Sequence, residues 1–137
     1  MAVKDIQDSS QGLTAIAPVV VTGNTPVVSE IIKADYFALE FFTSIGTIAD
    51  AAATFAVTIE DGNQSNLSDA APVDSNFLSG TLADAGFAFG DNNETRQIGY
   101  VGKKQYVRYT ITPSGVTTTA SFCVLAVKAQ SPTVPHL

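Results

Sequence analysis

The sequence predicts an all-β protein, an antiparallel jelly-roll-like sandwich of about eight strands with little or no helix. Three observations predict this class. Short runs of β-branched, aromatic and aliphatic residues recur, some of them alternating with polar residues; turn residues separate these runs at short intervals; and no amphipathic stretch could supply the helices of a parallel α/β fold. We therefore expect one β-sandwich domain over residues 1–137.

The first predicted strand covers residues 14–21 and belongs at a sheet edge, because Pro18 has no N–H to donate to a ladder. A turn at residues 23–26 leads to a short second strand over residues 27–33. The apolar run over residues 37–42 predicts a central strand.

In this central strand Phe37, Leu39 and Phe41 lie on one face, with Glu40 and Phe42 on a mixed opposite face. A helix is the competing interpretation, and we reject it because the run is short, aromatic-rich and lacks a capping box.

The next stretch, residues 45–53, contains glycine and several alanines, which predicts a loop or a short helical turn. Phe55, Val57 and Ile59 then alternate with more polar neighbours, which predicts a strand with one solvated face. It ends at the turn residues 61–63.

About thirty polar and small residues follow, a length that is unusual for a structureless connection. We expect short strands there, anchored in the core by the aromatic segments 77–78 and 87–89.

The most informative stretch is residues 98–109, where two β-type runs flank a basic connection that begins with Gly102. The pattern predicts a β-hairpin in which Gly102 supplies a positive φ. A second strand pair is predicted from residues 106–112 and 119–128, joined by a turn at residues 113–115.

The segment GYVGKKQYVRYTITPSG, followed by an alternating terminal strand, resembles the small β-sandwich cement (decoration) proteins of tailed bacteriophages and prophages, in which the corresponding stretch commonly reads GYiGdkrYvRv. The resemblance extends upstream through residues 29–32, 36–45 and 55–62, and covers residues 26–128. Two departures are the Lys103-Lys104 pair, where the family often has an acid and then a base, and the absence of tryptophan.

This resemblance implies a structural virion protein that binds the major capsid protein lattice on the capsid exterior and stabilises the phage head. It would be made in the cytoplasm of the bacterial host, and we expect a homo-oligomer, for which a dimer is one candidate. The alternative is a sandwich module of a phage tail or fibre that binds glycans or a host surface through its tyrosines.

Composition favours contact with other subunits over a monomer coated in uncharged polar side chains. Charged residues make up 15% of the chain and hydrophobic residues 45%, whereas an ordinary soluble domain carries roughly 25% charged residues. The net charge of −6 disfavours a nucleic-acid partner. The chain shows neither the apolar region of a secretory signal nor a membrane-length apolar run, so we expect no membrane partner.

Charge is unevenly distributed along the chain. Between residues 60 and 94 all charged side chains are acidic, and after residue 94 all are basic. This pattern predicts an acidic end and a basic end of the domain, and Arg96, Lys103 and Lys104 are the candidate partner contacts. The alternative is that the acids only solvate loops and the bases only protect an edge strand from aggregation.

The sequence offers no catalytic constellation, cofactor site or metal site, so we expect a protein that is not an enzyme. His136 is the only histidine and lies at the end of the chain, and the single cysteine, Cys123, is expected to be a buried, inert thiol. Residues 61–65 begin like a calcium loop, but Asn66 and Pro72 occupy positions that require glycine and glutamate, which favours a polar turn. The segments 1–13 and 130–137 are expected to be irregular arms, either ordered by a neighbouring subunit or frayed.

Overall fold

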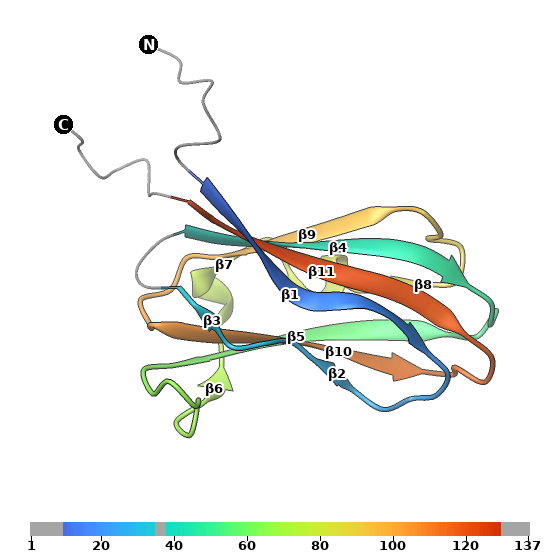
Figure 1. The fold of residues 1–137 in the computed structure, drawn as a ribbon, viewed down its shortest axis with the longest axis horizontal. Helices are drawn as coiled ribbons and strands as arrows, with labels where there is room; N and C mark the ends of the chain where they lie inside the picture. Colours follow the sequence, from blue (N-terminus) through green and yellow to red (C-terminus); the bar gives the residue numbers. More distant parts are fainter. Residues whose placement is uncertain (1–9, 35–37, 130–137) are drawn as a thin grey trace, which may run out of the picture.

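The computed structural model describes residues 10–34 and 38–129. These residues fold into two antiparallel sheets packed face to face (Figure 1). The five strands of sheet A are β1 (Ser10–Val21), β4 (Ala38–Ile48), β7 (Leu78–Ser79), β9 (Thr95–Tyr100) and β11 (Ala120–Ala129). The six strands of sheet B are β2 (Val27–Val28), β3 (Ile32–Lys33), β5 (Thr54–Gly62), β6 (Ala71–Pro72), β8 (Phe87–Ala88) and β10 (Tyr106–Ser114). The predicted all-β sandwich is confirmed.

The strand order is that of a jelly roll. Sheet A runs β1-β11-β4-β9-β7, and sheet B runs β2-β10-β5-β6, with β3 also paired to β10 and β8 also paired to β5. If β2 and β3 count as one strand and the short β7 and β8 are set aside, eight strands remain. When these eight strands are numbered 1 to 8 along the chain, their order is 1-8-3-6 in sheet A and 2-7-4-5 in sheet B, which is the strand order of a jelly roll. Helix is limited to a 3₁₀ turn, η1 (Ser75–Phe77), and one short helix, α2 (Leu82–Ala85), within the described residues.

The core lies between the sheets and is lined by alternate residues of the long strands. Phe55, Val57 and Ile59 of β5 are buried as the alternation predicts. Phe55 stacks on Phe87 with ring centroids 4.6 Å apart, and Phe122 of β11 packs edge-on against both rings. No buried side-chain nitrogen or oxygen in the described part of the chain lacks a hydrogen-bond partner.

The edge and central strands have the predicted positions. β1 lies at the edge of sheet A, with a register shift between Ile16 and Val19 that brackets Pro18. β4 lies between β11 and β9, and Leu39 and Phe41 are buried while Glu40 is half-buried on the other face. Phe37 lies outside the described residues.

Three boundary predictions are corrected. The predicted loop over residues 45–53 is wrong in its first part, because β4 continues to Ile48 and Phe122 of β11 pairs with Ile45. The predicted arm 1–13 is too long, because β1 begins at Ser10. The second predicted strand, residues 27–33, is two separate strands of two residues each, β2 and β3. Residues 1–9 and 130–137 of the predicted arms lie outside the described residues.

The excursion between β5 and β9 contains the short strands that were expected, β6, β7 and β8. Phe87 is buried and Leu78 is half-buried, so both anchor the excursion. Phe77 and Phe89, expected to be buried anchors, are instead 42% and 48% exposed.

The predicted hairpin over residues 98–109 is wrong, because β9 and β10 belong to opposite sheets. Each strand has one buried face, with Ile98 and Tyr100 on β9 and Val107 and Tyr109 on β10. These faces meet across the core. Both this arrangement and a hairpin bury every second residue of each strand, so the alternation of apolar and polar residues fits either one.

The second predicted pair is wrong for the same reason, since β11 pairs with β1 and β4 and not with β10. The predicted turn at residues 113–115 is wrong in its first part, because Pro113 and Ser114 belong to β10. The chain turns from Gly115, which adopts a positive φ of 76°. Gly102 is not among the described glycines with positive φ. A Cβ on it would instead lie 2.5 Å from the Tyr100 ring, so Gly102 serves close packing.

Candidate functional site

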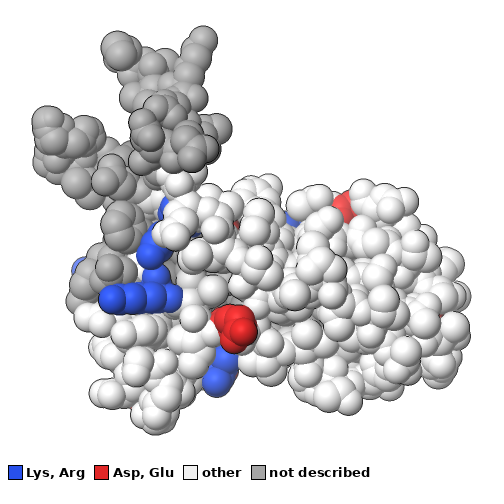
Figure 2. Space-filling view, in the orientation of Figure 1, with Lys and Arg blue, Asp and Glu red and all other residues white. Residues whose placement is uncertain are grey.

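Four lysines lie at one end of the sandwich, which we call the basic end: Lys33, Lys103, Lys104 and Lys128. Lys33 pairs with Tyr106 at the start of β10, directly after the loop that carries Lys103 and Lys104. The Lys128 ammonium donates to the Lys33 carbonyl oxygen at 3.3 Å. Figure 2 shows lysine and arginine gathered at the left of this view, on a face otherwise largely free of charge.

Arg96 does not join the basic end. It lies near the start of β9, roughly 13 Å of extended chain from Tyr100, where the basic loop begins. Its guanidinium forms ion pairs with Asp91 at 2.9 Å and with Glu94 at 2.7 Å. The three predicted contact residues therefore do not form one cluster.

The prediction of an acidic end and a basic end is wrong. Asp61 and Asp69 of the acidic block lie beside the Lys103-Lys104 loop, and the two arginines that follow the block are paired with its carboxylates. Arg96 is paired with Asp91 and Glu94, and Arg108 of β10 is paired with Glu60 of β5 at 2.8 Å. Antiparallel pairing places Arg108 opposite Glu60, although 48 residues separate them in the sequence.

The Tyr100 side chain holds the loop of the basic end. Its hydroxyl donates to Asp61 Oδ2 at 2.7 Å and accepts the Lys104 amide N–H at 3.1 Å. Burial, and then the bond to Asp61, raises the pKa of Tyr100 above its usual value. The tyrosine thus joins β9 of sheet A, β5 of sheet B and the backbone of the Lys103-Lys104 loop.

A second tyrosine joins the sheets deeper in the core. Tyr109 of β10 is buried, its hydroxyl lies 2.7 Å from the Thr43 hydroxyl on β4, and its ring stacks on Phe41 at 4.8 Å. Burial raises the pKa of Tyr109 to about 12. This bridge runs from sheet B to sheet A, the reverse of the Tyr100 bridge.

The segment that resembles the start of a calcium loop is organised by its own hydrogen bonds. Asp69 accepts the backbone N–H groups of Asn63 and Gln64, chiefly the former, and these bonds with nearby Lys104 lower the pKa of Asp69. Asp61 accepts the Tyr100 hydroxyl. The two carboxylates therefore have structural roles, and no group of three or more His, Cys, Asp or Glu residues gathers as metal ligands in the described ranges.

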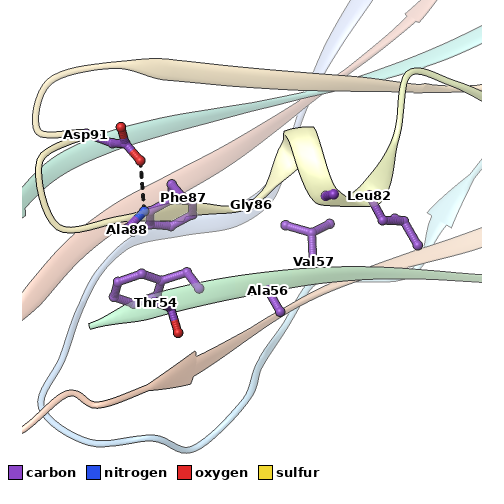
Figure 3. Close-up of a pocket in the computed structure, with 10 residues that line it drawn as sticks. Thr54, Ala56, Val57, Leu82, Gly86, Phe87, Ala88 and Asp91 are labelled. Carbon is purple, nitrogen blue, oxygen red and sulfur yellow. Dashed lines mark hydrogen bonds between the residues drawn. The ribbon is translucent and has the colours of Figure 1, made fainter. Parts of the chain in front are cut away.

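An open cleft of about 530 Å³ lies between β5 and the α2–β8 segment (Figure 3). Small and aliphatic residues such as Ala56, Val57, Leu82 and Gly86 line it. Its one ionisable side chain is Asp91, which accepts the Ala88 N–H at 2.8 Å and is paired with Arg96, so it holds the β8–β9 connection. The lining provides no pair of carboxylates for acid–base chemistry.

The outer face of sheet A carries an apolar surface, which we call the apolar face, formed by Val20, Phe42, Cys123, Leu125 and Val127. Leu125 lies directly opposite Phe42 in the ladder and is 45% exposed, and Val20 is 62% exposed. A hollow of about 430 Å³ is lined in part by Val20 and Cys123 and in part by the polar residues Ser44, Asn93 and Ser121. Exposed apolar surface of this kind typically marks contact with another molecule.

The outer face of sheet B is different. Its threonine face consists of small or hydroxyl-bearing side chains, namely Thr54, Ala56, Thr58, Thr110, Thr112 and Ser114. Register pairs Thr58 with Thr110 and Ala56 with Thr112. The exposed Val28 of β2 also belongs to this outer face, opposite Thr110, but the two long strands present hydroxyl-bearing or small side chains where β4 and β11 present Phe42 and Leu125.

The sequence did not reveal the apolar face, although it did predict that Phe42 lies on a mixed face of its strand. Cys123 is half-exposed on this face, so the expected buried thiol is wrong. Tyr100 and Tyr109 are buried and cannot form a glycan platform, whereas Tyr106 is half-buried on sheet B and Tyr36 lies outside the described residues. His136 also lies outside them, and no helix in the described part is long and apolar enough to cross a membrane.

Neither a protein-family model nor a curated protein matches the sequence. Among solved structures, the chain is similar to VP2 in a subviral particle of infectious bursal disease virus, with 15% identity and a TM-score of 0.55, covering 92% of this chain and 33% of that one. It is also similar to xylanase 10B of Clostridium thermocellum, whose CBM22-1-GH10 modules were solved with xylohexaose, with 13% identity and a TM-score of 0.52, covering 95% and 28%.

The SPBc2 prophage-derived protein YomS is 13% identical, with a TM-score of 0.47 and coverage of 86% of this chain and 92% of that one. The chain spans about a third or less of the VP2 and xylanase chains. At these identities the two likenesses with TM-scores above 0.5 support the β-sandwich fold alone.

Proposed function

We propose that the chain is a nonenzymatic structural protein of a tailed-phage particle, a cement or decoration protein that binds the assembled lattice of the major capsid protein from outside. The observation that carries the proposal is the apolar face on a weakly charged jelly roll: Leu125 and Phe42 present apolar surface to a partner on a rigid sheet. The resemblance of residues 99–115 to cement proteins supplies the identity of the partner.

The mechanism is mass action. A protein that binds the assembled shell but not dispersed subunits shifts the equilibrium toward the shell, by about 2.7 kcal/mol per site at a free concentration about 100 times the dissociation constant. Many copies on one lattice multiply this effect, so modest affinity at each site suffices.

The glycan-binding alternative is weakened by the positions of the tyrosines. Tyr100 and Tyr109 point into the core, so neither can stack on a sugar ring. The likeness to a xylanase chain concerns the fold and carries no substrate to this protein.

The direct test is co-sedimentation of the purified chain with heads of the phage or prophage that encodes it, prepared from a deletion of its gene. We expect saturable binding to heads, no binding to dispersed capsid subunits, and a higher disruption temperature of the decorated heads. Absence of binding to heads, or selective binding on a glycan array instead, contradicts the proposal.

The basic loop is tested in the same assay with Lys103→Gln and Lys104→Gln together. We propose that these exposed lysines contact the partner, so the double variant binds more weakly at low salt while its unfolding midpoint is unchanged. The matched control is Thr58→Asp with Thr112→Asp, which changes the net charge equally on the threonine face. Equal binding of both double variants removes the lysines from the interface.

A further inference from the structure

One charged side chain, Glu40, lies on the outer face of sheet A beside the apolar face. Among the described residues that point outward from β4, β9 and β11, Glu40 is the only acidic residue, and none is a lysine or arginine. Lys128 and Arg96 belong to these strands but pair across from the buried Leu39 and Thr43, so they occupy the inward-facing register.

Glu40 lies flat within this surface. It is opposite Val127 in one ladder and Gly99 in the other, and a Cβ on Gly99 would meet Glu40 Oε1 at 2.6 Å. Its Oε2 accepts the Gln97 side-chain N–H at 3.1 Å, from the residue opposite Phe42. The carboxylate is therefore half-buried beside apolar groups and has one neutral donor in this face.

A second copy of the chain is a poor occupant of the face. A two-fold interface brings the same patch from both subunits together. It would enclose two Glu40 carboxylates and add no cation from the face, and an enclosed charge without a partner is strongly unfavourable. Charge complementarity instead requires a covering surface that brings its own cation.

We propose that the apolar face is the capsid-binding surface of this protein, and that the complementary patch on the partner is apolar with one lysine or arginine placed to pair with Glu40. The inference rests on the proposed function and specifies the chemistry of its partner. The cation compensates the carboxylate, while Phe42, Leu125 and Val127 supply the apolar contact. The hollow beside Cys123 accepts a protruding apolar side chain of the partner.

The test compares Leu125→Glu with Thr112→Glu in co-sedimentation with heads that lack the protein. Both positions are exposed on long strands and both changes add one negative charge, but they lie on opposite outer faces. We expect Leu125→Glu to weaken binding by about tenfold or more, and Thr112→Glu to leave it within about twofold. Leu125→Ser provides the same test should the glutamate variant fail to fold.

Charge is tested with Glu40→Gln and Glu40→Lys. The lysine variant places like charges together, so it should bind at least about tenfold more weakly than wild type, with the glutamine variant between them. Binding of Glu40→Lys equal to that of wild type overturns the cation assignment.

The outcomes separate the two proposals. If the wild-type chain binds heads and Leu125→Glu binds equally well, the apolar face is not the contact and this inference fails, while the binding to heads itself supports the proposed function. If the wild-type chain does not bind heads, the proposed function fails, and this inference with it. If analytical ultracentrifugation shows a wild-type dimer that Leu125→Glu dissociates, the occupant is a second copy and the inference is overturned.

Discussion

Two tyrosines bridge the sheets in opposite directions. One of them only joins the sheets within the core, whereas the other also holds a surface loop in place. Tyr109 reaches from sheet B to the Thr43 hydroxyl in the middle of the core. Tyr100 reaches from sheet A to the Asp61 carboxylate at the basic end, and its hydroxyl also accepts the Lys104 N–H. The first bridge unites neutral groups within the core, whereas the second also orders a loop that carries candidate partner contacts.

The largest expected effect comes from breaking the inner bridge. Thr43→Val removes the partner of a buried hydroxyl, so the free energy of unfolding should fall by about 1–3 kcal/mol in urea titrations followed by circular dichroism. Thr43→Val combined with Tyr109→Phe replaces both polar groups by apolar ones, and the loss should be smaller than the sum of the two single losses. Strict additivity would show that the hydroxyls do not depend on each other.

The outer bridge should respond differently. Tyr100→Phe keeps the ring but removes one donor and one acceptor near the surface, so the global loss should be about 1 kcal/mol. The local effect should be larger, with faster amide hydrogen exchange at Lys104 and reduced binding to heads. Thr43→Val, with a comparable or greater global loss, is the matched control, because it should leave exchange at Lys104 unchanged. Equal exchange in both variants contradicts a role of Tyr100 in ordering the loop.

The smallest effect concerns alkaline pH. Tyr109 has a folded-state pKa of about 12 against 10.0 for an unburied tyrosine, so its contribution to stability is complete below the unfolded value and is lost as pH rises through the folded one. Between about pH 9 and about pH 11, this group should cost the wild-type chain about 1 kcal/mol of unfolding free energy. Tyr109→Phe lacks the titrating hydroxyl and should show a smaller loss over the same interval. An equal loss would assign the effect to other groups.

Much of the secondary structure follows from local patterns. The alternation of Phe55, Val57 and Ile59, the edge position of the strand with Pro18, and the turn at Gly115 are confirmed, because side-chain period, a missing N–H and a positive φ are properties of a few neighbouring residues. The exposure of Phe77 and Phe89 was not predicted, because hydrophobicity alone does not say which apolar residue of a short segment faces the core.

The candidate site was less predictable than the strands. Lys103 and Lys104 lie at the basic end, but the position of Arg96 and its two carboxylate partners depends on how the β8–β9 connection folds. The apolar face unites residues from positions 20 to 127, and their adjacency depends on the order β1-β11-β4. No local pattern reports such an order, since it is set by pairing between distant strands.

By itself, the sequence determined that this chain is a succession of strands with one buried face each, and that charged residues make up only 15% of it. Only the tertiary structure decided that β9 and β10 face each other across the core and are not paired in a hairpin, that Gly102 makes room for Tyr100, and that Glu40 lies beside Phe42 and Val127 with Gln97 as its hydrogen-bond donor. The physical reason is that strand formation needs only neighbours along the chain, whereas sheet membership is decided by burial and hydrogen bonds between residues far apart in sequence.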